Sequence, residues 1–426
     1  MLNSIKKFFR NLNPDIVVQS PSRINLINPL DAVEGDFWMP SVAINGIENP
    51  LSAFCYIKKS NTNSKIKMYK IIKNSNNDKF EIYIEEELSK DINDFKEKFT
   101  GKLKLIYASI YRFNKTNSYF WDKVLKRDFE IGVLTTIPRQ SGLGGSAAII
   151  ISVLYALAKY FNLYNNFTCL NTHNPPINKD IIAEMATKVE DKDLKITAGY
   201  SDRYVISRGG LAFCSYYGKL LHKEITKEPL AIYDRIDLTY DISELPIIIC
   251  FSGYSHESGS VHFKLRNKYL KGVPRILNFY EKLAEVAWKA RFALMSHNWK
   301  LLGNFFIENT KIMNQVMKDV GFVYGIGLVN NLLINLIEDH PDVYAVKLTG
   351  AGEGGSVFAL VNPDNIEVVL QEWKKKLEEI IVDKSSFKSK FPTYPMETRE
   401  HLRNAEFFQI RINQNGVSIM KNFEQL

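Results

Sequence analysis

A loop rich in glycine and small residues, PRQSGLGGSAA at 138–148, is the stretch of this sequence best suited to bind phosphate. It follows a predicted strand and leads into a long apolar run, so its backbone N–H groups and the start of the next helix favour an anion. The Ser146 hydroxyl could cap that helix or help to hold a magnesium ion between two phosphates, and this loop alone leaves both interpretations open. The residues expected at the phosphates are Pro138, Gly142, Leu143, Gly144, Gly145, Ser146 and Ala147.

Other phosphate-binding motifs fit less well. GLGGSA and GAGEGG at 350–355 have the glycine spacing of a dinucleotide-binding turn, which lies between a strand and a helix. The GLGGSA motif begins several residues after its strand, and no further strand ending in an acidic residue follows about twenty residues later. The GAGEGG motif leads into a strand instead of a helix. The P-loop pattern and the HRD and DFG elements of protein kinases are absent from the sequence. A Rossmann oxidoreductase is therefore a weak alternative.

The elements around this loop divide into two kinds. Residues 16–135 contain short apolar and β-branched runs broken by Asn, Ser and Gly, which predicts a β-rich, largely antiparallel region with the helices coming after it. Helices are predicted at 146–161 and 178–193. In the second of these, Glu190 is four residues from Ala186 along the apolar stripe, so it is predicted to point inward; a surface acid is the alternative.

The second half of the chain has a different order. From about 246 we predict a strand, helices near 274–295, 298–318 and 325–338, two strands around the second glycine loop, a helix near 364–382 and a final strand. Setting aside the extra helices, this β-α-β-β-α-β order favours a ferredoxin-like sheet. We therefore expect an α+β protein with domains at 14–235 and 236–426.

Composition limits the possible partners. The chain has 426 residues, 45% of them hydrophobic and 24% charged, as in a soluble globular protein. The net charge of +8 is spread among acids without a basic stripe, so a pocket for a small anionic ligand is favoured over nucleic acid. No secretion signal and no membrane span are predicted, which favours the cytoplasm. A monomer and a homodimer are both compatible with the sequence.

Three separated stretches together resemble the GHMP small-molecule kinases, which include galactokinase, mevalonate kinase, homoserine kinase and sugar-1-kinases. These stretches are PSRINLINPLDAVEGDFWMPSVAI at 21–44, PRQSGLGGSAA at 138–148 and KLTGAGEGGSVFAL at 347–360. The resemblance implies an S5-like N-terminal domain joined to a ferredoxin-like one, with ATP phosphates in the middle motif. Within the family, NPLD at 28–31, IPRQ, ITAGYSDRY and SGSVHFKLR are most similar to motifs of the glucuronokinases.

The resemblance also implies catalytic and metal-binding roles. Ser146 and Glu190 would hold Mg²⁺, and Asp202 would accept the proton of the acceptor hydroxyl. Arg23 would keep Asp202 ionised and stabilise the transferring phosphoryl group. Without the resemblance, Asp202 would be interpreted as a turn residue before a strand and Arg23 as an exposed strand residue.

Further residues are candidates for the acceptor site. Asp31 would bind sugar hydroxyls, with a loop-capping aspartate as the alternative. A uronate carboxylate or a phosphate could be met by Arg203, His262 and Arg266. The third motif would contribute Gly350, Ala351 and Gly352, although it carries Glu353 where the family usually has a small residue.

The resulting expectation is an ATP- and Mg²⁺-dependent kinase for the anomeric hydroxyl of a monosaccharide, with glucuronate as the favoured acceptor. A kinase for a heptose phosphate, galactose or a mevalonate-like acid is one alternative. A non-catalytic relative that binds sugar or nucleotide is another, and the presence of Ser146, Glu190 and Asp202 speaks against it.

Overall fold

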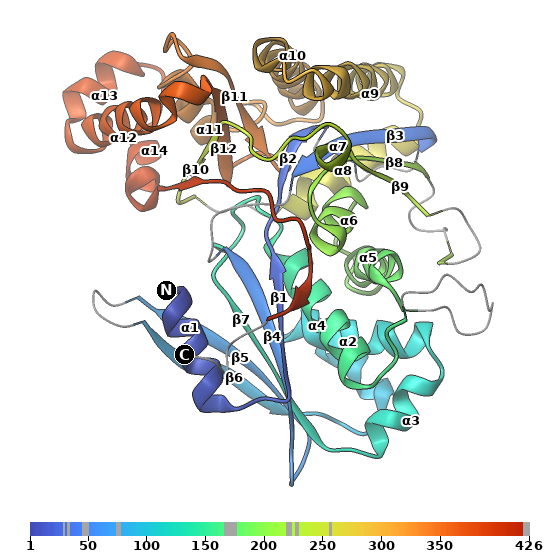
Figure 1. Cartoon of the computed structure of the whole chain (residues 1–426). Coiled ribbons are helices and arrows are strands. Elements are labelled where there is room, and N and C mark those ends of the chain that lie inside the picture. The colour runs from blue at the N-terminus through green and yellow to red at the C-terminus, as the bar shows by residue number, and fades with distance from the viewer. Residues whose placement is uncertain are drawn as a thin grey trace.

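The structure of the chain is a computed structural model (Figure 1). It describes residues 1–28, 30–31, 35–44, 51–73, 78–165, 177–218, 224–225, 230–254 and 258–420, with the backbone alone for 35–44, 217, 218 and 258. No helix in these ranges combines the length and the apolar character that crossing a membrane requires.

The largest sheet of the described chain has six strands in the order β14-β1-β4-β7-β5-β6. Helix α4 packs on one face, and the short helix α1 lies on the other, where Ile5 and Phe9 are buried against Phe54 and Tyr56 (Figure 1). These elements are α1 Leu2–Leu12, β1 Ile16–Pro21, β4 Ser52–Lys59, β5 Lys65–Ile72, β6 Lys79–Glu87, β7 Phe129–Thr135, α4 Gly145–Tyr160 and β14 Ser418–Ile419.

The expectation that helices follow the β-rich region is wrong, because helical elements also occur within it. They are the 3₁₀ segment Ile92–Thr100, α2 Lys104–Thr116 and α3 Tyr119–Leu125. Helix α2 buries Ile106, Ile110 and Phe113 at helical spacing and packs against α4. Its β-branched and aromatic residues favour strands by local propensity, and this burial against α4 overrides that preference.

A second sheet in the described residues has the order β2-β3-β8-β9 and lies between the large sheet and the C-terminal helices. Helices α5 and α6 stand between it and α4, so that several elements of the N-terminal half converge at one place (Figure 1). The elements are β2 Ile24–Ile27, β3 Gly35–Ile44, α5 Lys179–Lys188, a π-helical turn Val189–Asp193, α6 Ser201–Arg208, β8 Leu211–Gly218, β9 Ile232–Arg235 and α7 Ile236–Thr239.

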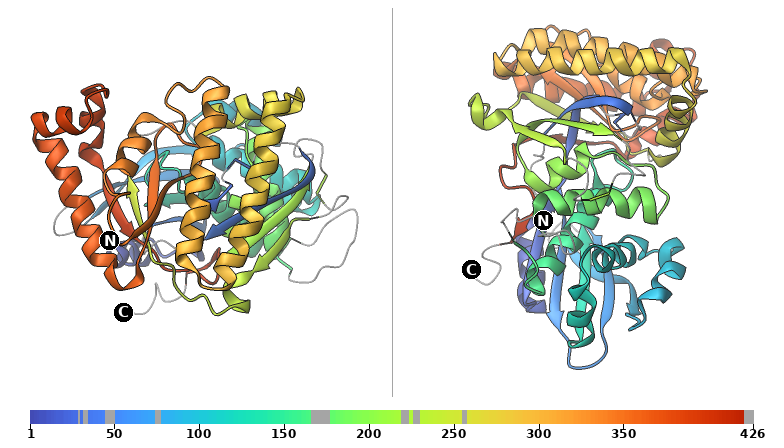
Figure 2. Two further views of the ribbon diagram at one scale, coloured as in Figure 1. Left: turned by 90° about the horizontal axis from the view of Figure 1, so that it is seen from above. Right: turned by 90° about the vertical axis from the view of Figure 1, so that its right-hand side faces the viewer.

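The predicted ferredoxin-like unit is confirmed. Its four described strands form an antiparallel sheet in the order β11-β12-β10-β13. Helices α9 and α10 lie side by side (Figure 2); α10 packs on β11 of this sheet, and α9 packs on β3 of the second sheet. Its elements are α8 Ser258–Leu270, α9 Pro274–Met295, α10 Trp299–Asp319, α11 Leu328–Asn335, α12 Ile366–Val382, α13 Lys384–Lys390, α14 Glu397–His401, and the 3₁₀ segments Pro363–Asn365 and Leu402–Asn404. Its strands are β10 Ile247–Phe251, β11 Val343–Thr349, β12 Ser356–Val361 and β13 Glu406–Gln409.

The two halves of the chain are not separated by a simple linker. Helix α7 begins directly after β9, at the predicted domain boundary. Strand β14 crosses back from the C-terminal half and pairs antiparallel with β1, Val18 lying opposite Ile419. The division into residues 14–235 and 236–426 therefore stays a prediction.

Candidate active site

The glycine loop lies between β7 and α4 and contacts the third motif directly. Gly142 and Gly144 have φ angles of 74° and 77°, which side chains rarely tolerate. A Cβ on Gly142 would lie 2.8 Å from the carbonyl oxygen of Thr349, and one on Gly350 would lie 3.1 Å from Cα of Gly142. The middle and third motifs thus meet backbone to backbone, and glycine is required on both sides of the contact.

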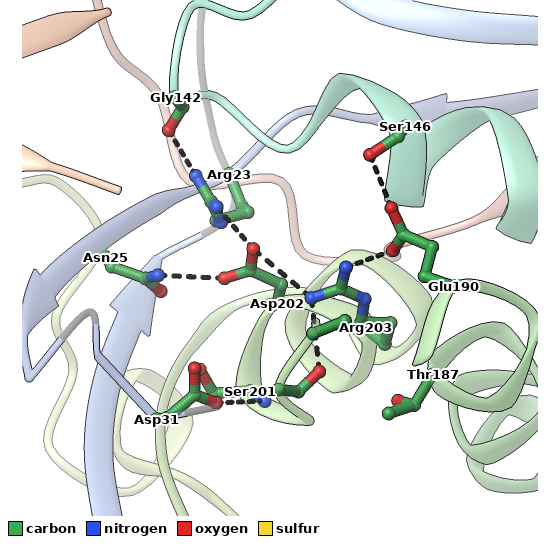
Figure 3. Close-up of polar contacts among 12 residues, drawn as sticks. Arg23, Asn25, Asp31, Gly142, Ser146, Thr187, Glu190, Ser201, Asp202 and Arg203 are labelled. Atoms are coloured by element: carbon green, nitrogen blue, oxygen red, sulfur yellow. Dashed lines mark hydrogen bonds and ion pairs between the residues drawn. The ribbon is translucent and has the colours of Figure 1, made fainter. Parts of the chain in front are cut away.

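Ser146 lies in the first turn of α4 and faces Glu190. Its hydroxyl donates to Glu190 Oε1 at 2.7 Å (Figure 3). The N-cap residue of α4 is Gly144, which caps without a side chain, so the capping interpretation of Ser146 is wrong. Glu190 lies in the π-helical turn and is buried, so the alternative of a surface acid is also wrong.

Asp202 lies in the first turn of α6 and is held by two donors. Arg23 donates to its Oδ2, and Asn25 Nδ2 donates to its Oδ1 at 2.8 Å (Figure 3). Asp202 is therefore not a turn residue before a strand, because it lies in the first turn of a helix. Arg23 is not an exposed strand residue, because it is buried. The other terminal nitrogen of Arg23 donates to the carbonyl oxygen of Gly142.

The electrostatics of Asp202 follow from this arrangement. Burial by itself raises the pKa of the carboxyl group, but the charge and hydrogen bond of Arg23, the charge of Arg203 and the hydrogen bond of Asn25 outweigh it and lower the pKa to about 2. Asp202 is thus an ionised carboxylate at neutral pH.

Arg203 links the two acidic residues of the site. Its guanidinium pairs with Glu190 Oε2, donates to the carbonyl oxygen of Gly199 at 3.1 Å and has a nitrogen 3.6 Å from Asp202 Oδ2 (Figure 3). The sequence pointed to Arg203 as a partner of the acceptor, whereas its partners here are the chain's own carboxylates.

Asp31 is buried and accepts a hydrogen bond from the backbone N–H of Ser201 at 3.0 Å, at the start of α6. Burial, with the charge of Asp202, raises the pKa of Asp31. This contact corresponds to the capping alternative, and a contact between Asp31 and sugar hydroxyls stays a prediction. Pro29, in the same NPLD motif, lies outside the described residues.

Arg266 and His262 lie on α8. Arg266 donates to Asp191 Oδ1 at 2.6 Å and to the carbonyl oxygen of Ala198 at 3.2 Å, so its charge is matched by a buried acid. Burial lowers the pKa of His262 to about 4, and the charges of Arg266 and Arg203 act in the same direction. His262 is thus neutral at neutral pH. Their contact with an acceptor stays a prediction.

The oxygen ligands fit magnesium. The Ser146 hydroxyl and the Glu190 carboxylate are hard donors that meet at the N-terminus of α4. Within the described ranges, no group of three or more His, Cys, Asp or Glu side chains could hold a metal ion. A hydroxyl and one carboxylate suit Mg²⁺, which commonly takes its other ligands from water and substrate phosphates.

Several of the buried polar atoms without a partner in the described chain belong to the segments that form this site, although others, such as those of Asn309 and Trp373, lie elsewhere. Since such atoms are rare in folded proteins, they mark a place where a ligand or ordered water completes the hydrogen bonding. In the described chain they include Ser22 Oγ, Arg23 Nε, Asn25 Oδ1, Ser141 Oγ, Asp191 Oδ2, Ser201 Oγ and Arg203 Nε.

Asn25 and Thr349 were not singled out by the sequence. Asn25 is two residues after Arg23 at the start of β2, so the strand period could have placed it on the same side as that arginine. Thr349, the last residue of β11, accepts a hydrogen bond from the backbone N–H of Asn25 at 2.9 Å.

Comparison with known proteins agrees with this architecture. Residues 104–210 match the GHMP kinases N terminal domain, and residues 330–379 match GHMP kinases C terminal. The chain is 26% identical over 272 residues to D-glycero-alpha-D-manno-heptose 7-phosphate kinase of Campylobacter jejuni, covering 62% of this chain and 68% of that protein. It is also 26% identical over 251 residues to glucuronokinase 1 of Arabidopsis thaliana, covering 58% and 62%.

The fold is similar to that of Lactococcus lactis galactokinase complexed with galactose. The TM-score is 0.62 at 17% identity, covering 98% of this chain and 100% of that one. At this identity the likeness is one of fold.

Proposed function

Since the chain carries both the N-terminal and the C-terminal domain of the GHMP kinases, we propose that it is a sugar kinase that phosphorylates the anomeric hydroxyl of a monosaccharide. ATP is the phosphoryl donor and Mg²⁺ the metal, and glucuronate is the favoured acceptor. The motifs shared with glucuronokinases and the similarity to glucuronokinase 1 of Arabidopsis thaliana support glucuronate as the acceptor.

One observation carries the proposal. Arg23 donates from one nitrogen to the glycine-loop carbonyl of Gly142 and from another to Asp202. A single cation thus lies between the loop expected to bind the phosphates and the carboxylate expected to meet the acceptor. Phosphoryl transfer depends mainly on such positioning and on charge stabilisation.

The chain's residues have separate tasks in this reaction. The N–H groups of the glycine loop and the N-terminus of α4 bind the phosphates. Magnesium at Ser146 and Glu190 would neutralise phosphate charge. Arg23 stabilises the charge on the transferring group. Asp202 orients the acceptor hydroxyl and accepts its proton.

The low pKa of Asp202 is compatible with the role of base. The transition state of phosphoryl transfer is loose, so the hydroxyl becomes strongly acidic only as its bond to phosphorus forms. An ionised carboxylate that stays ionised until that moment orients the hydroxyl throughout and receives the proton late.

A heptose phosphate is the second candidate acceptor, because the relative from Campylobacter jejuni is named for one. Recognition of either anionic acceptor would fall to Arg203, Arg266 and His262. A non-catalytic binding role is disfavoured by the assembled contacts of Ser146 with Glu190 and of Arg23 with Asp202.

The test is turnover of an acceptor panel by the purified chain with ATP and Mg²⁺. Glucuronate, galactose, a heptose 7-phosphate and mevalonate are compared by ADP release, and NMR identifies the phosphorylated position. We expect an anomeric phosphate, with Asp202→Asn inactive. Asp237→Asn, which removes another buried carboxylate from an ion pair with an arginine, is the matched control and should stay active. ATP binding without turnover of any acceptor would overturn the proposal in favour of a binding protein.

A further inference from the structure

Asn25 joins Asp202 to the C-terminal sheet. Its side-chain Nδ2 donates to Asp202 Oδ1 at 2.8 Å, and its backbone N–H donates to Thr349 Oγ1 at 2.9 Å. All three residues are buried. One asparagine thus contacts a helix of the N-terminal half and the last residue of β11.

An irregularity in β2 accompanies these contacts. Asn25 lies opposite Ala43 of β3, but Ile27 lies opposite Val42, so two residues of β2 advance for one of β3. Such a bulge re-aims side chains and backbone groups, and bulges recur beside active sites. Here the bulge follows directly after Asn25, whose backbone N–H donates to Thr349 and whose side chain donates to Asp202.

The second donor matters for the orientation of the carboxylate. The terminal torsion of an aspartate is broad and roughly two-fold, so one partner leaves the plane of the carboxylate poorly defined. Arg23 contacts Oδ2 and Asn25 contacts Oδ1, and together they define that plane. The Oδ1 atom of Asn25 has no partner in the described chain, so Asp202 alone accounts for the orientation of the amide.

Thr349 brings the third motif into this arrangement. It directly precedes Gly350, and its carbonyl oxygen is the atom that a Cβ on Gly142 would approach to 2.8 Å. The same residue therefore contacts the glycine loop through its carbonyl and Asn25 through its hydroxyl.

We propose that Asn25 is a positioning residue for Asp202, and that Thr349 holds Asn25 in place from the C-terminal sheet. The proposal rests on the proposed role of Asp202 as the base. On this proposal, the alignment of Asp202 depends on the contact between the third motif, at 347–360, and the stretch at 21–44 that contains Asn25.

The kinetic test compares Asn25→Ala with Thr349→Val and Thr349→Ser. Asn25→Ala should lower kcat by about 10- to 100-fold and leave KM for ATP within about twofold. The acidic limb of the pH–rate profile should move to higher pH, because Asp202 loses a hydrogen bond that favours its ionised form. Thr349→Val should lower kcat in the same direction, and Thr349→Ser, which retains the hydroxyl, should restore it. Asn309→Ala truncates another buried asparagine and should keep kcat within about twofold.

A readout independent of activity separates this proposal from the proposed function. Hydrogen exchange of the Asn25 backbone amide, followed by NMR, should be at least about tenfold faster in Thr349→Val than in the wild type and unchanged in Thr349→Ser. That result would stand even if no acceptor were turned over.

The double variant completes the test. Because Thr349 is proposed to act through Asn25, Asn25→Ala combined with Thr349→Val should lower kcat no further than Asn25→Ala alone. Additive losses would overturn the link through Asn25. An unchanged pH–rate profile in Asn25→Ala would overturn the positioning role of Asn25. Equal amide exchange in Thr349→Val and the wild type would overturn the role of Thr349 in holding Asn25.

Discussion

Arg23 and Asp202 form a buried ion pair between residues 179 positions apart in the sequence. The pair brings the turn before β2 against the first turn of α6. It also offsets the burial of the carboxyl group, whose pKa falls to about 2. The state of this pair therefore determines over which pH range the proposed base is ionised.

Replacing Arg23 should affect both rate and pH dependence. In Arg23→Met the largest influence that lowers the pKa of Asp202 is lost, so the pKa rises and the acidic limb of kcat moves upward in pH. We expect kcat at neutral pH to fall by about 10²–10³-fold. Arg208→Met, which breaks the more exposed ion pair with Asp180, should leave the profile unchanged. Equal profiles for the two variants would contradict the assignment of Arg23.

The contact between Ser146 and Glu190 predicts the magnesium dependence. Ser146→Ala and Glu190→Gln should each raise the Mg²⁺ concentration needed for half-maximal activity by about tenfold or more. Ser152→Ala removes a buried hydroxyl from the same helix, where it donates to the carbonyl oxygen of Ile149, and serves as the control. Magnesium titrations that superimpose for Ser146→Ala and Ser152→Ala would argue against this metal site.

The close approach at Gly142 predicts a cost that combines backbone strain and steric clash. Gly142→Ala should lower the free energy of unfolding by about 1–3 kcal/mol and weaken ATP binding, because its Cβ would meet the carbonyl oxygen of Thr349. Gly272 also has a positive φ, of 66°, but a Cβ there would meet nothing within 4 Å. Gly272→Ala should therefore lose only about 1 kcal/mol and bind ATP normally. Thermal unfolding and ATP titration compare the two, and equal effects would show that the loop tolerates a side chain.

Lys347 predicts an unusual pH dependence of stability. It is buried in β11, its Nζ donates to the carbonyl oxygen of Leu348 at 2.9 Å, and burial lowers its pKa from 10.5 to about 7. Between these values the unfolded chain binds more protons than the folded one, so this group makes stability rise with pH from about 7 to 10.5.

Lys347→Met should remove that dependence and raise Tm at pH 7, by on the order of 3 °C. Lys376→Met, which replaces an ion-paired lysine on α12, is the control. Melting curves across this pH range check the prediction, and a lower Tm for Lys347→Met would show that the amino group is stabilising where it lies.

The sequence predicted best where periodicity and burial agree. Between β10 and β13 the predicted strands and the predicted helices near 274–295, 298–318, 325–338 and 364–382 are observed in the predicted order. Helices α8, α13 and α14 of the same region were not predicted. Helix α2 was missed because residues such as Ile110 and Tyr111 have strand propensity, and its helical state depends on packing against α4.

The site residues divide in a similar way. The resemblance to the family predicted that three distant motifs form one site, but it did not predict which residue each side chain contacts. Arg203 lies 13 residues from Glu190, and their pairing depends on a π-helical turn that no local pattern indicated. The contact of Asn25 with Thr349 joins residues 324 positions apart in the sequence, and no local pattern indicates it.

The pairing of β14 with β1 has a consequence for how the protein is made. Val18 is paired with Ile419, and the backbone of Met420 donates to Val17 at 2.8 Å. On the ribosome β1 therefore emerges long before this neighbour, and one edge of the large sheet stays open while the ferredoxin-like unit is synthesised. The sheet of the N-terminal half therefore cannot be completed until residues 418–420 have been synthesised.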